Sequence, residues 1–239
     1  MQKEIDINKV VRQHLEMNQY FSGFTIKSPK ETPNDNQVKQ MNKKDKQKEL
    51  DKITDEVRIC CSCELVSTRT KVVPGEGNPN ARIMFIGEAP GADEDAQGRP
   101  FVGRAGQLLE KIIIACGLKR SDVFIGNILK CRPPGNRDPR AEEIISCLPF
   151  LQRQIEIIEP EIIVALGAHA AKTLLDTNTP IGQLRGRFHE YHSSINQKPI
   201  KLMATYHPAY LLRNYSQENR RRVWEDMKKV LIELDLPVP

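Results

Sequence analysis

The most distinctive chemistry in this sequence belongs to four of its cysteines. Cys60 and Cys63 form a C-x-x-C pair, and Cys131 and Cys147 lie far downstream with 15 residues between them. A close pair and two distant thiols can assemble into one four-thiolate site, and soft thiolates select zinc or an iron–sulfur cluster. The spacing therefore predicts a metal centre and leaves both kinds of metal open.

A C-x-x-C pair is also typical of thioredoxin-like redox sites, in which the pair opens a helix directly after a strand. Here a helical pattern over 46–59 runs into Cys60, and a loop follows the pair. That context argues against a redox pair. Cys61 adjoins Cys60 and neighbouring side chains rarely reach one metal together, while Cys116 ends an apolar helical stripe and is expected in the core.

Three polar residues stand at the ends of short apolar runs. Glu88, Asn127 and His207 each lie at or just after the end of a segment that is typical of a buried strand. The carboxyl ends of parallel strands meet at one edge of a sheet, and ligands bind beyond that edge. A carboxylate, an amide and an imidazole in such positions indicate a binding or catalytic site there.

Strand and helix patterns alternate along the rest of the chain. Apolar runs typical of strands occupy 81–87, 123–128, 161–166 and 201–206, and helical patterns occupy 105–116, 140–159, 168–175 and 217–234. The run 161–166 is almost continuously apolar, as expected for a strand that is covered on both faces. The alternation predicts an α/β fold with a parallel sheet flanked by helices on both faces.

Length and composition allow one full domain and an extension. The chain has 239 residues and a formal charge of 36 − 31 = +5, which permits a polyanionic partner without requiring one. No apolar run approaches the roughly 18 residues that span a bilayer, and the first residues lack the apolar core of a secretory signal. We therefore expect no membrane association and a cytoplasmic location, where thiols stay reduced.

Residues 1–46 differ in composition from the rest of the chain. The stretch 27–45 is polar and charged, with almost no apolar side chain to bury. Such a composition is typical of disordered segments. We expect 1–46 to be a disordered N-terminal extension and 47–239 to form the folded domain.

Four long motifs, in this order, resemble the family 4 uracil-DNA glycosylases, the iron–sulfur type of bacteria and archaea. The motifs are CCSCEL at 60–65, VVPGEGNPNARIMFIGEAPGADEDAQGRPFVGRAGQLL at 72–109, NILKCRPPGNRDP at 127–139 and HPAYLLR at 207–213. The resemblance covers about 57–234, which is most of the chain. It implies a four-stranded parallel sheet between helices.

The resemblance also implies a cofactor and an activity. The family's ligand pattern for a [4Fe–4S] cluster falls on Cys60, Cys63, Cys131 and Cys147. The activity is hydrolysis of the N-glycosidic bond of uracil in DNA, which releases free uracil and leaves an abasic site for base excision repair. The implied partner is uracil-containing DNA, and we expect a monomer that acts near the nucleoid.

Breaking the glycosidic bond produces a sugar cation and a uracil anion, so the site needs a carboxylate on one side and a donor on the other. By resemblance, Glu88 and Asp95 are candidates to position water and stabilise the cation, and the choice between them stays open. Ala89 stands where the family 1 enzymes carry an Asp. His207 is the candidate donor to uracil O2.

A base inside a duplex must be flipped into a pocket before it can react. Phe101, in a loop rich in Gly and Pro, is the candidate to stack on the base. The amide of Asn127 offers both a donor and an acceptor, which match the O4/N3–H edge of uracil. Gly87 and Ala89, in the tight turn GEAPG, let the backbone approach the ligand.

Arginines near the expected site are candidates for binding DNA phosphates: Arg213, Arg185 and Arg137. Two other functions compete with the glycosylase. A non-catalytic iron–sulfur DNA-binding module of the same fold would be favoured if Glu88, Asn127 or His207 were replaced, but all are present. A zinc hydrolase is disfavoured because the sequence shows no cluster of His and carboxylate ligands for a catalytic metal.

Overall fold

The computed structural model describes residues 43–193 and 198–239. The first described helix, α2 (Lys43–Ile59), begins inside the segment that was expected to be disordered. Lys46 explains the earlier start, because its buried ammonium donates to the carbonyl of Ile158 at 3.1 Å and to the Glu159 carboxylate at 2.8 Å. The rest of that expectation, residues 1–42, lies outside the described residues.

The core of the protein is a six-stranded mixed sheet with the order β1-β3-β2-β4-β6-β5. The strands are β1 (Glu76–Gly77), β2 (Ile83–Gly87), β3 (Phe124–Asn127), β4 (Ile162–Leu166), β5 (Phe188–Tyr191) and β6 (Ile200–Thr205). The four strands that the sequence predicted, β2, β3, β4 and β6, are mutually parallel. The α/β class is thereby confirmed.

The sheet is wider than the predicted four strands because a short antiparallel strand is added at each edge. β1 pairs with β3, and β5 pairs with β6. Neither edge strand has the apolar run that marks the inner strands: β1 has only two residues, and three of the four residues of β5 are partly or fully exposed. Edge strands face solvent, so they carry little hydrophobic signal.

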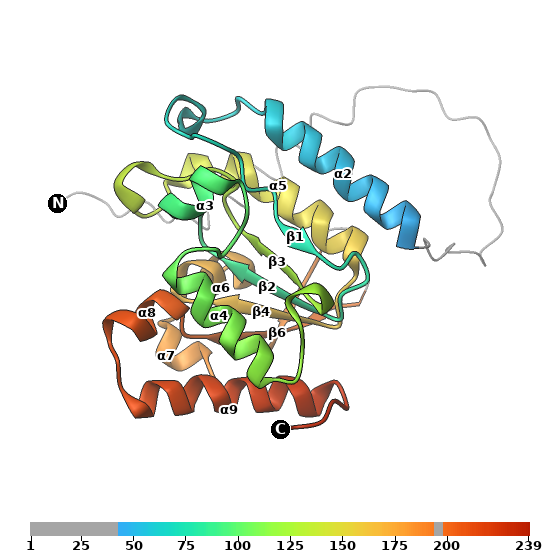
Figure 1. Ribbon diagram of the computed structural model, residues 1–239, viewed down its shortest axis with the longest axis vertical. Helices are drawn as coiled ribbons and strands as arrows, with labels where there is room; N and C mark the ends of the chain where they lie inside the picture. The colour runs from blue at the N-terminus through green and yellow to red at the C-terminus, as the bar shows by residue number, and fades with distance from the viewer. Residues whose placement is uncertain (1–42, 194–197) are drawn as a thin grey trace.

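Helices cover both faces of the sheet (Figure 1). They are α3 (Ala92–Gln97), α4 (Arg104–Ala115), α5 (Ala141–Ile158), α6 (Ala168–Leu175), α7 (Ile181–Leu184), α8 (Pro208–Arg213) and α9 (Gln217–Glu233). No described helix is both long and apolar enough to cross a membrane.

Side chains along each inner strand alternate between two core layers, as the pleat of a strand requires. On β2, Met84 and Ile86 pack with α2, α5 and α6. Ile83 and Phe85 point to the other face and pack with α4, α8 and α9. The sheet is therefore buried between two helical layers, and only its ends are open to a ligand.

Candidate active site

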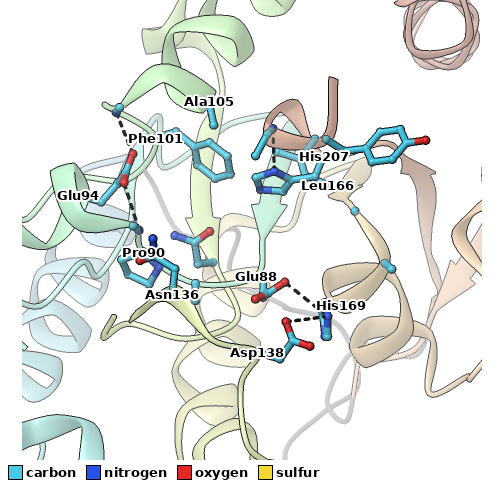
Figure 2. A pocket seen from close by; sticks show the side chains of 18 of the residues that line it. Glu88, Pro90, Glu94, Phe101, Ala105, Asn136, Asp138, Leu166, His169 and His207 are labelled. Carbon is cyan, nitrogen blue, oxygen red and sulfur yellow. Dashed lines mark hydrogen bonds and ion pairs between the residues drawn. The ribbon is translucent and has the colours of Figure 1, made fainter. Parts of the chain in front are cut away.

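A cavity of about 760 Å³ opens where the parallel strands end. Figure 2 shows side chains from several loops and helix starts directed into it. Its lining includes Glu88, Ala89, Phe101, Asn127, His207 and Arg213. The structure therefore brings together most of the residues that the sequence singled out, at the sheet edge where they were expected.

Gly87 makes room for two of these side chains. It is paired with Asn127 across β2 and β3. A Cβ atom at Gly87 would lie 2.5 Å from Asn127 Oδ1 and 2.6 Å from Phe101 Cζ. Only a glycine allows the amide and the ring to meet at this point, and both side chains are more than nine-tenths buried.

The Asn127 side chain offers a hydrogen-bond acceptor that a ligand could use. Its Oδ1 atom is the only buried side-chain oxygen or nitrogen in residues 43–193 and 198–239 that has no hydrogen-bond partner. A buried acceptor without a donor costs free energy, on the order of 1–3 kcal/mol. A ligand that carries an N–H group at this position would supply the missing partner.

Phe101 is held in an unusual backbone conformation with φ of 51°. Few residues other than glycine adopt it, and such strain persists only where the surroundings impose it. Arg120 donates to the Phe101 carbonyl at 3.3 Å, and α4 packs so closely that a Cβ at Gly106 would lie 2.0 Å from the Phe101 backbone. The ring centroid is consequently placed 5.7 Å from that of His207.

His207 caps the N-terminus of α8, where its Nδ1 accepts a hydrogen bond from the Ala209 amide at 3.0 Å. Because Nδ1 is an acceptor, the neutral ring carries its proton on Nε2. Burial and the positive charge of Arg213 lower the pKa of His207 to about 4. His207 is therefore a neutral donor at pH 7.

Glu88 lies at the mouth of the cavity with two residues that sequence reasoning missed, His169 and Asp138. The sequence was expected to lack a cluster of His and carboxylate ligands, but these three side chains form one, with ligand atoms within 4.8 Å of one another. Nε2 of His169 lies 3.8 Å from the Glu88 carboxylate and 3.5 Å from that of Asp138. Burial raises the pKa of Glu88, and the nearby His169 opposes that rise. His169 follows the end of β4, so the strand-end signal that identified Glu88 and His207 also pointed to it.

The structure corrects the expectation for Asp95. Its carboxylate is buried away from the cavity and accepts hydrogen bonds from the amides of Thr70 and Lys71 at 2.9 and 3.4 Å. The neighbouring Glu94 lines the cavity instead. Glu94 ties the cavity loops together by accepting from the Val102 amide at 2.8 Å and from two other backbone amides.

The three candidate arginines have different surroundings. Arg213 lines the cavity and is exposed. Arg137 also lines it, but both ends of its guanidinium are paired with Glu143. The expectation for Arg185 is corrected, because it lies outside the cavity lining and pairs at 2.6 Å with the fully buried Asp226.

Four cysteines meet at a second, much smaller cavity between α2 and α5. Its lining includes Cys60, Cys63, Cys131 and Cys147. Cys61 is exposed, and Cys116 is buried in the core layer under α4. The thiols that line this cavity are those that the spacing grouped into one site.

Two of these sulfur atoms accept hydrogen bonds from neighbouring groups. Arg69 donates to Cys131 Sγ at 3.3 Å, and the Lys130 amide donates to Cys147 Sγ at 3.1 Å. Donors of this kind support sulfur atoms that bind a metal. The four cysteines therefore form a candidate metal site.

Fold and cavity together define a class: a three-layer α/β protein with a strand-end pocket that holds a phenylalanine ring and a buried amide, and with a separate cavity lined by four cysteines. The chain belongs to the uracil-DNA glycosylase superfamily, whose family model matches residues 74–228.

The amino-acid sequences of several named proteins are similar to more than half of this chain. A type-4 uracil-DNA glycosylase of Saccharolobus solfataricus is 50% identical over 186 residues, which are 76% of this chain and 84% of that protein. One from Thermotoga maritima is 48% identical over 178 residues, 74% of this chain and 90% of that protein. A type-5 uracil-DNA glycosylase of Pyrobaculum aerophilum is 34% identical over 154 residues, 58% of this chain and 66% of that protein.

Proposed function

We propose that this chain is a DNA repair enzyme, a type-4 uracil-DNA glycosylase that removes uracil by hydrolysis and leaves an abasic site. The observation that carries the proposal is the buried, unpartnered amide oxygen of Asn127 beside the ring of Phe101. A flipped uracil presents a π-face, which can stack on the Phe101 ring, and an N–H group, which can donate to the unpartnered Asn127 oxygen.

Base recognition rests on Phe101 and Asn127. The ring of Phe101 stacks on the base, while Asn127 Oδ1 accepts from uracil N3–H and its amide nitrogen donates to O4. Cytosine has an acceptor at N3 and a donor at position 4, so it would meet like groups at both points.

Bond cleavage rests on His207 and Glu88. As the bond between C1′ and N1 breaks, its electron pair stays with uracil, and the Nε2–H of His207 donates to O2 of the leaving anion. A carboxylate at Glu88 stabilises the cationic sugar and accepts a proton from the water that attacks C1′. Asp95 has no part in this step, because its carboxylate is occupied by backbone amides.

Arg213 is the residue best placed to hold a DNA phosphate beside the cavity, with Arg137 as a second candidate. Substrate binding there would bring the scissile nucleotide to the cavity mouth. We also propose that the enzyme acts in the cytoplasm at the nucleoid, because genomic DNA is its substrate. We propose that it works there as a monomer.

We infer that Cys60, Cys63, Cys131 and Cys147 hold a [4Fe–4S] cluster. The meeting of all four cysteines at one small cavity and the hydrogen bonds from Arg69 and the Lys130 amide support it. When bound, the cluster would supply iron–thiolate bonds that tie the segment after α2 to the loop after β3, through Cys131, and to α5, through Cys147. It lies apart from the cavity in which uracil would react.

The test is excision from an oligonucleotide that holds one uracil, followed by alkaline cleavage of the abasic product. Strand scission is expected with uracil and not with thymine or cytosine at the same position. DNA binding without scission would contradict the proposal and favour the non-catalytic DNA-binding module.

A further inference from the structure

Three side chains from separate parts of the chain meet at the cavity mouth. Glu88 follows β2, Asp138 lies in the loop before α5, and His169 lies in the first turn of α6. Figure 2 shows both carboxylates facing the same edge of the imidazole, and Nε2 lies 3.8 Å from Glu88 and 3.5 Å from Asp138. The mechanism above uses only Glu88, so the other two have no assigned task.

The surroundings of Glu88 raise its pKa, whereas only the ionised carboxylate can stabilise a cation. Burial raises the pKa of Glu88, His169 and Arg213 oppose the rise, and Asp138 adds to it. Charged groups elsewhere on the cavity wall are Asp93, Glu94, Arg104 and Arg137. Of all these groups, His169 is the one with an N–H donor next to the Glu88 carboxylate.

We propose that His169 is a positioning residue that holds Glu88 ionised and facing the cavity, and that Asp138 holds the His169 ring between the two carboxylates. This inference rests on the proposed role of Glu88 in uracil excision. The side chain of Glu88 is 29% exposed, that of His169 is 44% exposed and that of Asp138 is 80% exposed. The three form a series from the cavity to the surface.

The geometry predicts pH effects of opposite sign for the two supporting residues. Excision requires ionised Glu88, so its rate falls at low pH as that carboxylate takes up a proton. In the folded protein the charge of His169 lowers the pKa of Glu88, and that of Asp138 raises it. His169→Gln removes a positive neighbour and shifts the acid limb of the rate profile to higher pH. Asp138→Asn removes a negative neighbour and shifts the limb to lower pH.

The experiment is single-turnover uracil excision by the full-length, cluster-loaded protein from about pH 4 to pH 8. Each shift is expected to be about 0.5–1 pH unit, the scale of one charge at about 4 Å in a water-like medium. The matched control is His192→Gln, because His192 is an exposed histidine that pairs with Glu190 on the surface, outside the cavity lining. It should leave the profile in place.

Glu88→Gln separates this inference from the proposed function. It should slow excision strongly and abolish the acid limb. If the wild-type protein excises uracil but the limb persists in Glu88→Gln, or if the His169 and Asp138 variants shift it in one direction or not at all, the inference is overturned while the glycosylase stands. A metal ion held by the three residues is the rival explanation. It would be revealed by loss of excision in EDTA, which we do not expect.

Discussion

At the scale of single residues, the cavity is organised by hydrogen bonds that leave particular atoms free for a ligand. His207 uses Nδ1 to accept the capping hydrogen bond of α8, which leaves its Nε2–H available to donate to the proposed uracil ligand. Asn127 keeps an oxygen without a partner, and Gly87 keeps the space in front of it open. Two predictions belong to this scale.

His207→Ala should lower the single-turnover rate by about 10²–10³-fold, the usual scale for losing one donor to a developing anion. Its contribution arises mainly in the transition state, so affinity for uracil DNA should change far less. The measurement is excision beside equilibrium binding. An unchanged rate in this variant would remove His207 from the chemistry.

Gly87→Ala should impair excision by about 10²-fold, because a misplacement of about 1 Å at a reacting site costs that much. The new methyl group would overlap Asn127 Oδ1 and Phe101 Cζ, at 2.5 and 2.6 Å. Gly126→Ala, where a Cβ would meet only ordinary van der Waals contacts at 3.7 Å or more, controls for a general effect of the substitution. Equal excision by both variants would show that the corner is not where the base sits.

At the scale of elements, helices and loops decide which charged groups reach the cavity. Asp95 and Glu94 are adjacent on α3, and successive helical residues point about 100° apart. One carboxylate therefore faces the cavity loops, and the other faces the backbone of Thr70 and Lys71. Arg213 and Arg185 differ in the same way, since one ends α8 in the open and the other packs against α9.

The two arginines should respond differently to substitution. Arg213→Ala should weaken DNA binding on all sequences and flatten its salt dependence by about one phosphate contact. Arg185→Ala should chiefly lower the free energy of unfolding, by about 3–5 kcal/mol, because it leaves the buried Asp226 without its cation. Salt titrations of binding and denaturant melts distinguish them. A reversed pattern would contradict both assignments.

The thiolate site connects α2 to the segment that leads into α5. Anaerobically purified protein should absorb broadly near about 400 nm, as thiolate-bound iron–sulfur clusters do. Cys131→Ala and Cys147→Ala should abolish that absorption, whereas Cys61→Ala and Cys116→Ala should retain it, because neither thiol lines the cavity. A colourless, zinc-loaded native protein would contradict the cluster.

At the scale of the whole molecule, the sheet and its two helical layers form a frame with one open edge. The frame is complete from Lys43 onward, since α2 is anchored to the end of α5 through Lys46. The family model matches only residues 74–228, which lie within it. We therefore predict that uracil excision does not require the residues before α2.

A protein shortened to begin at Lys43 should keep its cluster and its excision rate. The measurements are absorption near about 400 nm and single-turnover excision, compared with the full chain. Binding to long DNA at several salt concentrations tests whether residues 1–42 add phosphate contacts. Loss of the cluster in the shortened protein would place those residues within the folded domain.

The α/β class, the inner strands and the long helices could be predicted from the sequence alone. Their apolar periodicity is a local signal, and the strand-end positions of Glu88, Asn127 and His207 follow from it. The spacing of the cysteines likewise selected the four thiols that meet at one cavity. Edge strands β1 and β5 could not be predicted in this way, because exposed strands carry little apolar pattern.

Which charged groups contact one another could be seen only in the tertiary structure. The partners of Asp95, Arg185 and Glu88 come from distant parts of the chain: the Thr70–Lys71 backbone, Asp226 on α9, and His169 with Asp138. A side chain's local sequence fixes the element that carries it, but not the direction in which it points or what packs there. Those follow from how segments far apart in the chain come together around the sheet, and no local pattern encodes that.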